Sequence, residues 1–185
     1  MDELIDIVDK QGNPTGVTAL KSEVHQKGWY HNTVHLWLFT TKGEVLLQQR
    51  SHKKAIYPLL WDVSVAGHID AGEDFKTAAV REAKEEIGLN INKDALQKIG
   101  IKLHEGEYNG GLIKDNEFHH IYIAELQPDL STLKPDLDEV EAIKLVSIKK
   151  FYSLLDESDY NSHFVSTNKA YYEYVLKAIQ SKLNQ

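Results

Sequence analysis

Three acidic side chains in the stretch from Gly67 to Leu89 are spaced so that they would act on one ligand. Glu82, Glu85 and Glu86 stand at i, i+3 and i+4, which brings them to the same side of an α-helix. Carboxylates crowded in this way repel one another unless a cation lies among them. Hard oxygen ligands on a rigid helix suit Mg²⁺ or Mn²⁺, which usually bridge to substrate phosphates. The spacing therefore predicts a divalent-metal site for a phosphate compound.

The helix that carries these acids has recognisable ends. Asp74 is a good N-cap, and Gly88 stands where a left-handed residue would end the helix. Arg81 lies four residues before Glu85 and can also reach Glu73 in the preceding loop, so it would hold these carboxylates in place. The predicted apolar face consists of Ala79, Val80, Ala83 and Ile87. The alternative is a solvated, charge-rich surface helix, which is the commoner reason for such a composition.

Length and composition limit the class of protein. A chain of 185 residues is predicted to form a single domain that buries roughly 70% of its unfolded surface. It has no cysteine, which excludes disulfides, thiolate zinc sites and cysteine nucleophiles. A net charge of −7 argues against a duplex nucleic acid as partner. No apolar run approaches a membrane span and no signal peptide is visible, so we expect a soluble, cytoplasmic protein.

Alternating and apolar runs separated by turns predict a mixed β-sheet packed between helices, an α/β fold. The predicted strands are 4–8, a return strand from Val17, 31–40 paired as a hairpin with 44–50, 61–65, 96–108, 118–126 and 139–146. Residues 1–30 would form an N-terminal hairpin and short helix, and a second helix follows a cap at Ser147. Residues 168–185 would form a C-terminal amphipathic helix, with Tyr171, Val175, Ala178, Ile179 and Lys182 at helical spacing. Along 31–40, one face carries Val34, Leu36 and Leu38, and the other carries His35, Trp37 and Phe39.

Written as a pattern, Gly67 to Leu89 reads G-x5-E-x7-R-E-U-x-E-E-x-G-U, where U is aliphatic. This stretch resembles the Nudix box at all seven of its fixed positions, and its one departure is the small Ala83. The resemblance implies a Nudix-like α/β/α sandwich with a mixed sheet. It also implies one to three Mg²⁺ ions bound by the carbonyl of Gly67 with Glu82, Glu85 and Glu86. Glu73, Arg81, Glu85 and Glu86 would be the catalytic residues of the box.

The layout from Glu3 to about Val146 resembles the Nudix branch that contains isopentenyl diphosphate isomerase. The resemblance lies in KSEVH (21–25), His31, VLLQQRSHKKAIYPLLWDVS (45–64), GH (67–68) and DNE (115–117). It implies a second metal site at His25, His31, His68, Asp115 and Glu117. It also implies that Lys21, Arg50 and Lys54 face the diphosphate. Without the resemblance, Arg50 and Lys54 would equally well be an exposed loop pair.

Two departures from the isomerases favour hydrolysis. The position of their cysteine is Ala66 here, which can act neither as acid nor as base, and the box keeps all its acids. The leading hypothesis is a metal-dependent hydrolase that cleaves a phosphoanhydride in a nucleoside diphosphate linked to another group. Glu85 or Glu86 would be the general base, with Glu117 as the alternative. Rival hypotheses are an isomerase-like enzyme acting on isoprenyl diphosphates and a non-catalytic nucleotide-binding sensor.

Other residues are less informative. His35 is predicted to be structural, His163 has no recognisable partner, and His119 and His120 would face opposite sides of a strand. Substrate specificity is expected to reside in the loops at 51–58 and 106–115, although the sequence does not name the substrate. Oligomeric state is open, because the first strand and the terminal helix would cover either a partner in a homodimer or the chain's own core.

Overall fold

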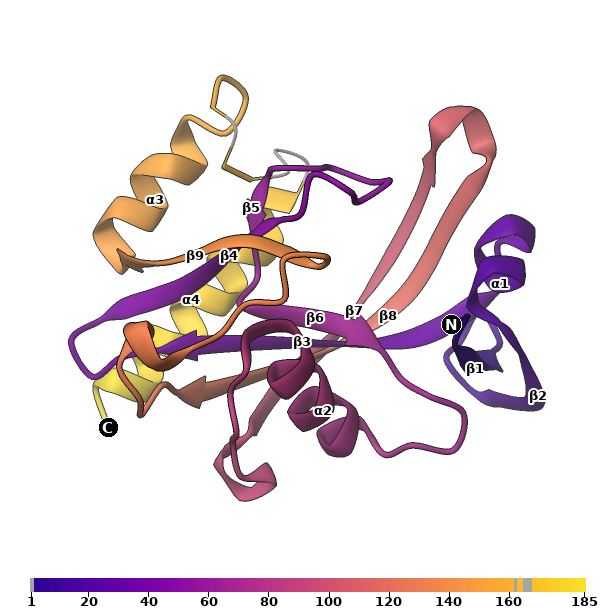
Figure 1. Cartoon of the computed structure of the whole chain (residues 1–185), viewed down its shortest axis with the longest axis horizontal. Helices are drawn as coiled ribbons and strands as arrows, with labels where there is room; N and C mark the ends of the chain where they lie inside the picture. Colours follow the sequence, from indigo (N-terminus) through magenta and orange to yellow (C-terminus); the bar gives the residue numbers. More distant parts are fainter. Residues whose placement is uncertain (1, 162, 165–167) are drawn as a thin grey trace.

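A computed structural model describes residues 2–161, 163–164 and 168–185 of the chain and shows a mixed β-sheet with helices on both faces (Figure 1). The strands are β1 (Leu4–Val8), β2 (Pro14–Leu20), β3 (Tyr30–Phe39), β4 (Glu44–Arg50), β5 (Trp61–Asp62), β6 (Val65–His68), β7 (Gln97–Tyr108), β8 (Ile113–Glu125) and β9 (Val140–Ser147). The α-helices are α1 (Lys21–Lys27), α2 (Phe75–Ile87), α3 (Ile148–Asp156) and α4 (Lys169–Leu183). Short 3₁₀ turns occupy Lys93–Ala95, Asn109–Gly111 and Leu130–Thr132.

Strand β3 organises the sheet because both of its faces are buried. Val34, Leu36 and Leu38 pack in a core with Ala78, Ala79, Ala83 and Ile87 of α2. Trp37 and Phe39 pack in a second core with Phe151 of α3 and with Tyr172, Val175, Leu176 and Ile179 of α4. The period-two alternation along the strand thus separates two apolar layers. The predicted α/β/α sandwich with a mixed sheet is confirmed.

The N-terminal extension adds a small third core. Strands β1 and β2 pair as an antiparallel hairpin, and α1 ends at Gly28, which adopts the left-handed conformation that favours glycine. Ile5, Ile7, Ala19 and Val24 pack together beside Trp29. Strand β1 also pairs with β3, so this extension is attached to the centre of the sheet. The predicted hairpin and helix within 1–30 are confirmed.

Long-range pairing corrects three sequence predictions. The predicted hairpin of β3 with β4 is wrong beyond its turn, since only Phe39 and Val45 pair between these two strands. Strand β3 is flanked instead by β6 and β8, and β4 pairs along its length with β9. The strand predicted at 61–65 is two short strands, β5 and β6, on different partners. Strand β8 starts at Ile113, five residues earlier than predicted, because the turn of the β7–β8 hairpin ends at Leu112.

The C-terminal helix lies against the chain's own core, as one of the two alternatives held. Its buried side chains are Tyr171, Tyr172, Val175, Leu176 and Ile179, so the predicted stripe is wrong at Lys182, which is exposed, and incomplete without Tyr172 and Leu176. Ala178 is only half-buried. None of the described helices is long and apolar enough to cross a membrane. A homodimer and the single-domain assignment stay predictions.

Candidate active site

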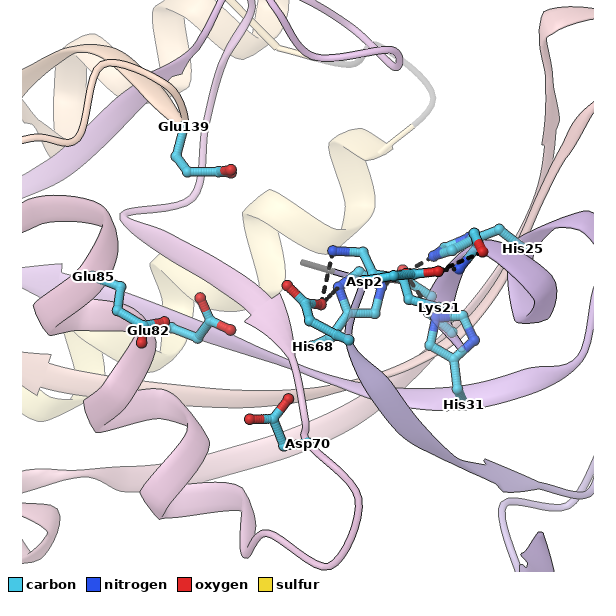
Figure 2. Close-up of polar contacts among 12 residues, drawn as sticks. Asp2, Lys21, His25, His31, His68, Asp70, Glu82, Glu85 and Glu139 are labelled. Carbon is cyan, nitrogen blue, oxygen red and sulfur yellow. Dashed lines mark hydrogen bonds and ion pairs between the residues drawn. The ribbon is translucent and has the colours of Figure 1, made fainter. Parts of the chain in front are cut away.

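A cavity of about 910 Å³ opens between α1, α2, β3, β6, the 51–58 loop and the β7–β8 hairpin. The box acids line this cavity from one side, with Glu82 and Glu85 on α2, and His25 of α1 and His68 of β6 line it from the other (Figure 2). His31 is fully buried beside His25 and His68. The rings of Tyr57 and Tyr108 meet edge to face at 5.4 Å between centroids and join the loop to the hairpin. Both sets of predicted site residues are therefore brought to one place.

Helix α2 begins and ends as its sequence predicts. The side chain of Asp74 accepts hydrogen bonds from the backbone N–H groups of Lys76 and Thr77, both at 3.1 Å. Gly88 has a φ of 68°, in the left-handed region. These caps satisfy backbone groups that the helix leaves free, and they fix which residues face the cavity.

The three box acids occupy unlike environments. Glu86 is 5% exposed and accepts hydrogen bonds from the backbone N–H of Ala66 at 3.1 Å and from Gln48 Nε2 at 3.2 Å. Burial, followed by the charge of Glu82, raises the pKa of Glu86 to about 8. Burial also raises the pKa of Glu82 to about 7, against the lowering effect of Arg81. The side chain of Glu85, by contrast, is 59% exposed. Burial thus outweighs the hydrogen bonds to Glu86 and the charge of Arg81 beside Glu82, and a further cation would favour the ionised forms of both carboxylates.

Gly67 lies where β6 comes close to the carboxylate of Glu82 on α2. A Cβ atom at this position would collide with the carboxylate of Glu82. The glycine therefore lets the backbone of β6 lie directly against an acid of the box. The metal-binding role of the Gly67 carbonyl stays a prediction.

Arg81 ties the box together. It donates hydrogen bonds to Glu73 at 2.9 Å, to Glu82 at 2.7 Å and to Glu85 at 3.0 Å. It also donates through Nε to Glu73 at 3.2 Å and through Nη2 to the backbone oxygen of His68 at 2.9 Å. The predicted contacts of Arg81 with Glu85 and Glu73 are confirmed. One guanidinium fork thus joins the loop before α2, the helix itself and the end of β6.

The second set of residues meets across four elements. His25 of α1, His31 of β3, His68 of β6 and Glu117 of β8 each offer a ligand atom, and these atoms lie within 4.8 Å of one another. Nε2 of His25 lies 3.1 Å from Nε2 of His68, and Nε2 of His31 lies 3.4 Å from Glu117. We call these four residues the histidine cluster.

The histidine cluster has the chemistry of a metal site. Nδ1 of His25 and Nε2 of His31 are buried and make no hydrogen bond with the described residues, an unusual state for buried polar atoms. Asp115 stands outside the cluster, 3.2 Å from Nδ1 of His25 but without hydrogen-bond geometry. Three imidazoles and a carboxylate fit a divalent ion.

The three predicted diphosphate-binding cations line the cavity, but each has a protein partner. Lys21 donates to Glu3 at 2.9 Å, Arg50 donates through Nε to the backbone oxygen of Ile56 at 3.0 Å, and Lys54 pairs with Glu139. Arg50 and Lys54 are half-buried at the cavity wall and are not an exposed loop pair, and their contact with the diphosphate stays a prediction.

Sequence reasoning missed part of the cavity wall. Glu139 lies across the cavity from the acids of α2 (Figure 2), and no spacing pattern marks it. His35, His104 and His119 form a stack, with ring centroids 4.0 Å apart for His35 and His119 and 5.6 Å apart for His104 and His119. As predicted, His119 and His120 face opposite sides: His119 lies 3.2 Å from Glu117, and His120 stacks on Phe75. His163 does have a partner, Lys144 at 2.7 Å.

The chain belongs to the Nudix family, since residues 29–167 match the NUDIX domain. Within that family it falls in the branch that contains the isopentenyl diphosphate isomerases, as the sequence predicted.

The relatives are both hydrolases and isomerases by name. The chain is 39% identical to "Nudix hydrolase 3" of Arabidopsis thaliana over 161 residues, which are 85% of this chain and 21% of that protein. It is 33% identical to "Isopentenyl-diphosphate Delta-isomerase 2" of Photorhabdus laumondii over 158 residues, which are 85% of each chain. Among solved structures, DR0079 from Deinococcus radiodurans has the same fold, with a TM-score of 0.65, 19% identity, and 91% of this chain and 96% of that chain covered.

Proposed function

We propose that this protein is a divalent-metal-dependent hydrolase that cleaves a phosphoanhydride bond in a nucleoside diphosphate linked to another group. The observation that carries the proposal is the complete set of box acids at one cavity, two of them with pKa values raised by burial. Such an arrangement is unfavourable without a cation and becomes favourable with one. The name of the Arabidopsis relative agrees with this class.

The residues present fit Mg²⁺ or Mn²⁺. The carbonyl of Gly67 with the carboxylates of Glu82, Glu85 and Glu86 would hold the ions, because all of them are oxygen ligands on one side of α2 and β6. When bound, such ions supply charge neutralisation for the diphosphate and acidify water. Lys21, Arg50 and Lys54 would exchange their present carboxylate and carbonyl partners for phosphate oxygens.

The roles of the protein groups follow from their freedom to move. Glu85 is exposed, and Arg81 is its one partner among the described residues, so it would swing to accept a proton from the attacking water. Glu86 is fixed by the backbone of Ala66 and by Gln48, so it would serve better as a ligand. Arg81 would fix the positions of Glu73, Glu82 and the end of β6 relative to one another. The rate acceleration would come mainly from the placement of the reacting groups and from electrostatic stabilisation of the transition state.

An isomerase-like reaction on isoprenyl diphosphates is the second candidate, because the histidine cluster is assembled in the way that branch of the family implies. Ala66, however, lies on the cavity wall with no group to move a proton. Double-bond migration without phosphate release would identify this reaction. Ligand binding with neither reaction would identify the sensor.

The experiment is an assay of the full chain with Mg²⁺ on nucleotide sugars, ADP-ribose, dinucleotide cofactors and isopentenyl diphosphate, with phosphate release and double-bond position both followed. We expect hydrolysis of at least one nucleoside diphosphate compound, and loss of it in the double variant Glu85→Gln, Glu86→Gln. Lys84→Ala, an exposed change on the same helix, is the control. Full turnover by the double variant would refute the proposal.

The proposed substrate-binding cations have a separate readout. Lys54→Ala and Arg50→Ala should raise KM by about threefold to tenfold each while the protein stays folded, because each removes a charge-assisted contact with phosphate. Lys53→Ala is the matched control, since Lys53 pairs with the exposed Asp138 outside the cavity. An unchanged KM in both variants would assign Arg50 and Lys54 to structure alone.

A further inference from the structure

His35 occupies a central position in the cavity that its predicted structural role does not explain. It lies on β3 directly opposite Ala66 of β6, so the two side chains share a face of the sheet. Both residues line the cavity. The ring of His35 is held by its stack on His119 and by an edge contact with the ring of Tyr171 at 5.6 Å between centroids.

A chain of hydrogen bonds fixes which nitrogen of His35 carries the proton. Trp37 Nε1 lies 2.9 Å from the hydroxyl oxygen of Tyr171, and an indole N–H can only donate. The same hydroxyl lies 2.6 Å from Nδ1 of His35. Tyr171 therefore accepts from Trp37 and donates its hydrogen to His35. Nδ1 of His35 is the acceptor, and the proton of the neutral ring is on Nε2.

The opposite arrangement is costly. If Nδ1 carried the proton, the hydroxyl of Tyr171 would face two donors, and its own hydrogen would have no acceptor among the described residues. Tyr171 is 4% exposed, so that hydrogen would be buried and unsatisfied. Burial also raises the pKa of Tyr171 well above its usual range, which keeps the hydroxyl protonated.

Nε2 of His35 is left free to meet a ligand. It makes no hydrogen bond within the part of the chain that the structure describes. Fully buried polar atoms without a partner occur in His25, His31, Gln48 and His163. Nε2 of His35 is not one of them, so this unpartnered atom is accessible from the cavity. Burial, with the neighbouring His119 as the next cause, holds the pKa of His35 well below its ordinary value. The ring thus presents a neutral N–H donor.

We propose that His35 is a fixed hydrogen-bond donor to an oxygen of the substrate, with Tyr171 and Trp37 as the residues that position it. The inference rests on the proposed function for the ligand being an organic diphosphate. An oxygen would then lie beside Ala66, at the wall of the cavity. A ligand that places only hydrocarbon there leaves the N–H of His35 desolvated and unpaired, and a site built in this way discriminates against it. The C-terminal helix, which carries Tyr171, is part of the specificity of the site.

The first test is the position of the proton. Long-range ¹H–¹⁵N correlation spectra of the histidine side chains should show His35 as the Nε2–H tautomer in the wild-type protein. In Tyr171→Phe the donor to Nδ1 is lost, and the Nδ1–H form should become populated. Tyr152→Phe, which removes a hydroxyl between α3 and Gln180 of α4 away from the cavity, is the matched control and should leave His35 unchanged. An Nδ1–H tautomer in the wild-type protein overturns the proposal, whether or not hydrolysis is found.

The second test is the substrate contact. His35→Leu removes the donor and should raise KM by about threefold to tenfold on the best substrate of the panel. His35→Gln places an amide N–H near the former Nε2 and should recover most of that loss. The exposed His52, which pairs with Glu141, provides the control variant His52→Leu. Equal kinetics of wild-type protein, His35→Leu and His35→Gln would overturn the proposal.

A third test asks which part of the substrate carries the acceptor oxygen. The protein is titrated with inorganic pyrophosphate, ADP-ribose and isopentenyl diphosphate, each with Mg²⁺, while the His35 Nε2 signal is followed. A shift with all three assigns the acceptor to phosphate, and a shift with ADP-ribose alone assigns it to the group attached to the diphosphate. A shift without hydrolysis of any compound supports the role of His35 and refutes the proposed function. No shift with any probe overturns the proposal for His35.

Discussion

The two sides of the cavity are built in opposite ways. The acids Glu82, Glu85 and Glu86 come from one helix and are related by helical spacing alone. The histidine cluster comes from α1, β3, β6 and β8, and depends on the parallel register that sets His31 beside Glu117 and the antiparallel register that sets Thr33 beside His68. A site on one helix survives changes elsewhere in the fold, whereas a site across four elements requires the whole sheet.

The two sides also differ in how their charges are compensated. On α2, Arg81 is the cation that contacts the acids, and the pKa values of Glu82 and Glu86 stay raised. In the cluster, burial raises the pKa of Glu117, but the nearby imidazoles of His119 at 3.2 Å and His31 at 3.4 Å outweigh it and hold the pKa well below its usual value. The negative charge of the acids of α2 is therefore only partly compensated by the protein, whereas the cluster carries more of its own compensation.

The largest expected effect is on kcat and tests which side of the cavity supplies the general base. Glu85→Gln should lower kcat by about 10²–10⁴-fold, because it removes the exposed carboxylate that is free to accept a proton. Glu117→Gln should cost less in kcat, because the carboxylate of Glu117 is already engaged and its low pKa makes it a poor base. Steady-state kinetics at saturating Mg²⁺ measure both. A larger loss in Glu117→Gln would move the base to the cluster.

The next effect is on stability and tests the uncompensated charge of α2. In metal-free protein the pKa of Glu86 rises from the ordinary 4.5 to about 8 on folding, so the folded state binds more protons than the unfolded state between these values. Stability from this group is therefore lost as pH rises from about 4.5 to 8. Glu86→Gln should match the parent near pH 4.5 and exceed it by a few kcal/mol at pH 8.

Thermal unfolding in EDTA at several pH values measures this difference. Glu85→Gln, at an exposed side chain, is the control. Addition of Mg²⁺ should stabilise the parent most at high pH, where the carboxylates would otherwise repel. Parallel curves for the parent and Glu86→Gln would show that Glu86 is not strained in the metal-free protein.

A third, smaller effect concerns which ion each side prefers. Imidazole nitrogens suit Zn²⁺ and similar ions, while carboxylates suit Mg²⁺ and Mn²⁺. His68→Gln should weaken Zn²⁺ binding by at least tenfold and leave the Mg²⁺ dependence of activity nearly intact, since it removes a cluster ligand only. Glu82→Gln should do the reverse. Calorimetric titration with each ion distinguishes the two, and a variant that weakens both ions equally would show that the sides form one site.

The smallest predicted effect tests how local the acid site is. Asp74→Ala removes the N-cap of α2 and should lower the free energy of unfolding by about 1 kcal/mol. Ser147→Ala removes the N-cap of α3, which accepts from the backbone N–H of Lys150, and should cost a similar amount. Only Asp74→Ala should also weaken Mg²⁺ binding, because only α2 carries the acids. Chemical denaturation and ion titration of both variants check this comparison.

The accuracy of the sequence predictions follows the same division. The caps at Asp74 and Gly88, the pairing of Arg81 and the two faces of β3 were all predicted, because each depends on neighbours within a few residues. The start of β8 was predicted too late, and the β3–β4 hairpin was wrong beyond its turn, because strand ends and partners are set by ladders with distant segments. His35 was assigned to structure because a single strand position carries no sign of Tyr171, 136 residues later.

The sequence by itself determined the helix that presents Glu82, Glu85 and Glu86, since the geometry of an α-helix and its caps is local. It also determined the family, through residues at fixed spacing in one stretch. The family resemblance implied that His25, His31, His68 and Glu117 share a site, but only the tertiary structure shows how closely they meet and leaves Asp115 outside them. Only the tertiary structure shows that Tyr171 of the C-terminal helix reaches His35. These contacts join segments that meet only when the strands assemble beside β3, so they cannot be predicted from the spacing of residues within one segment.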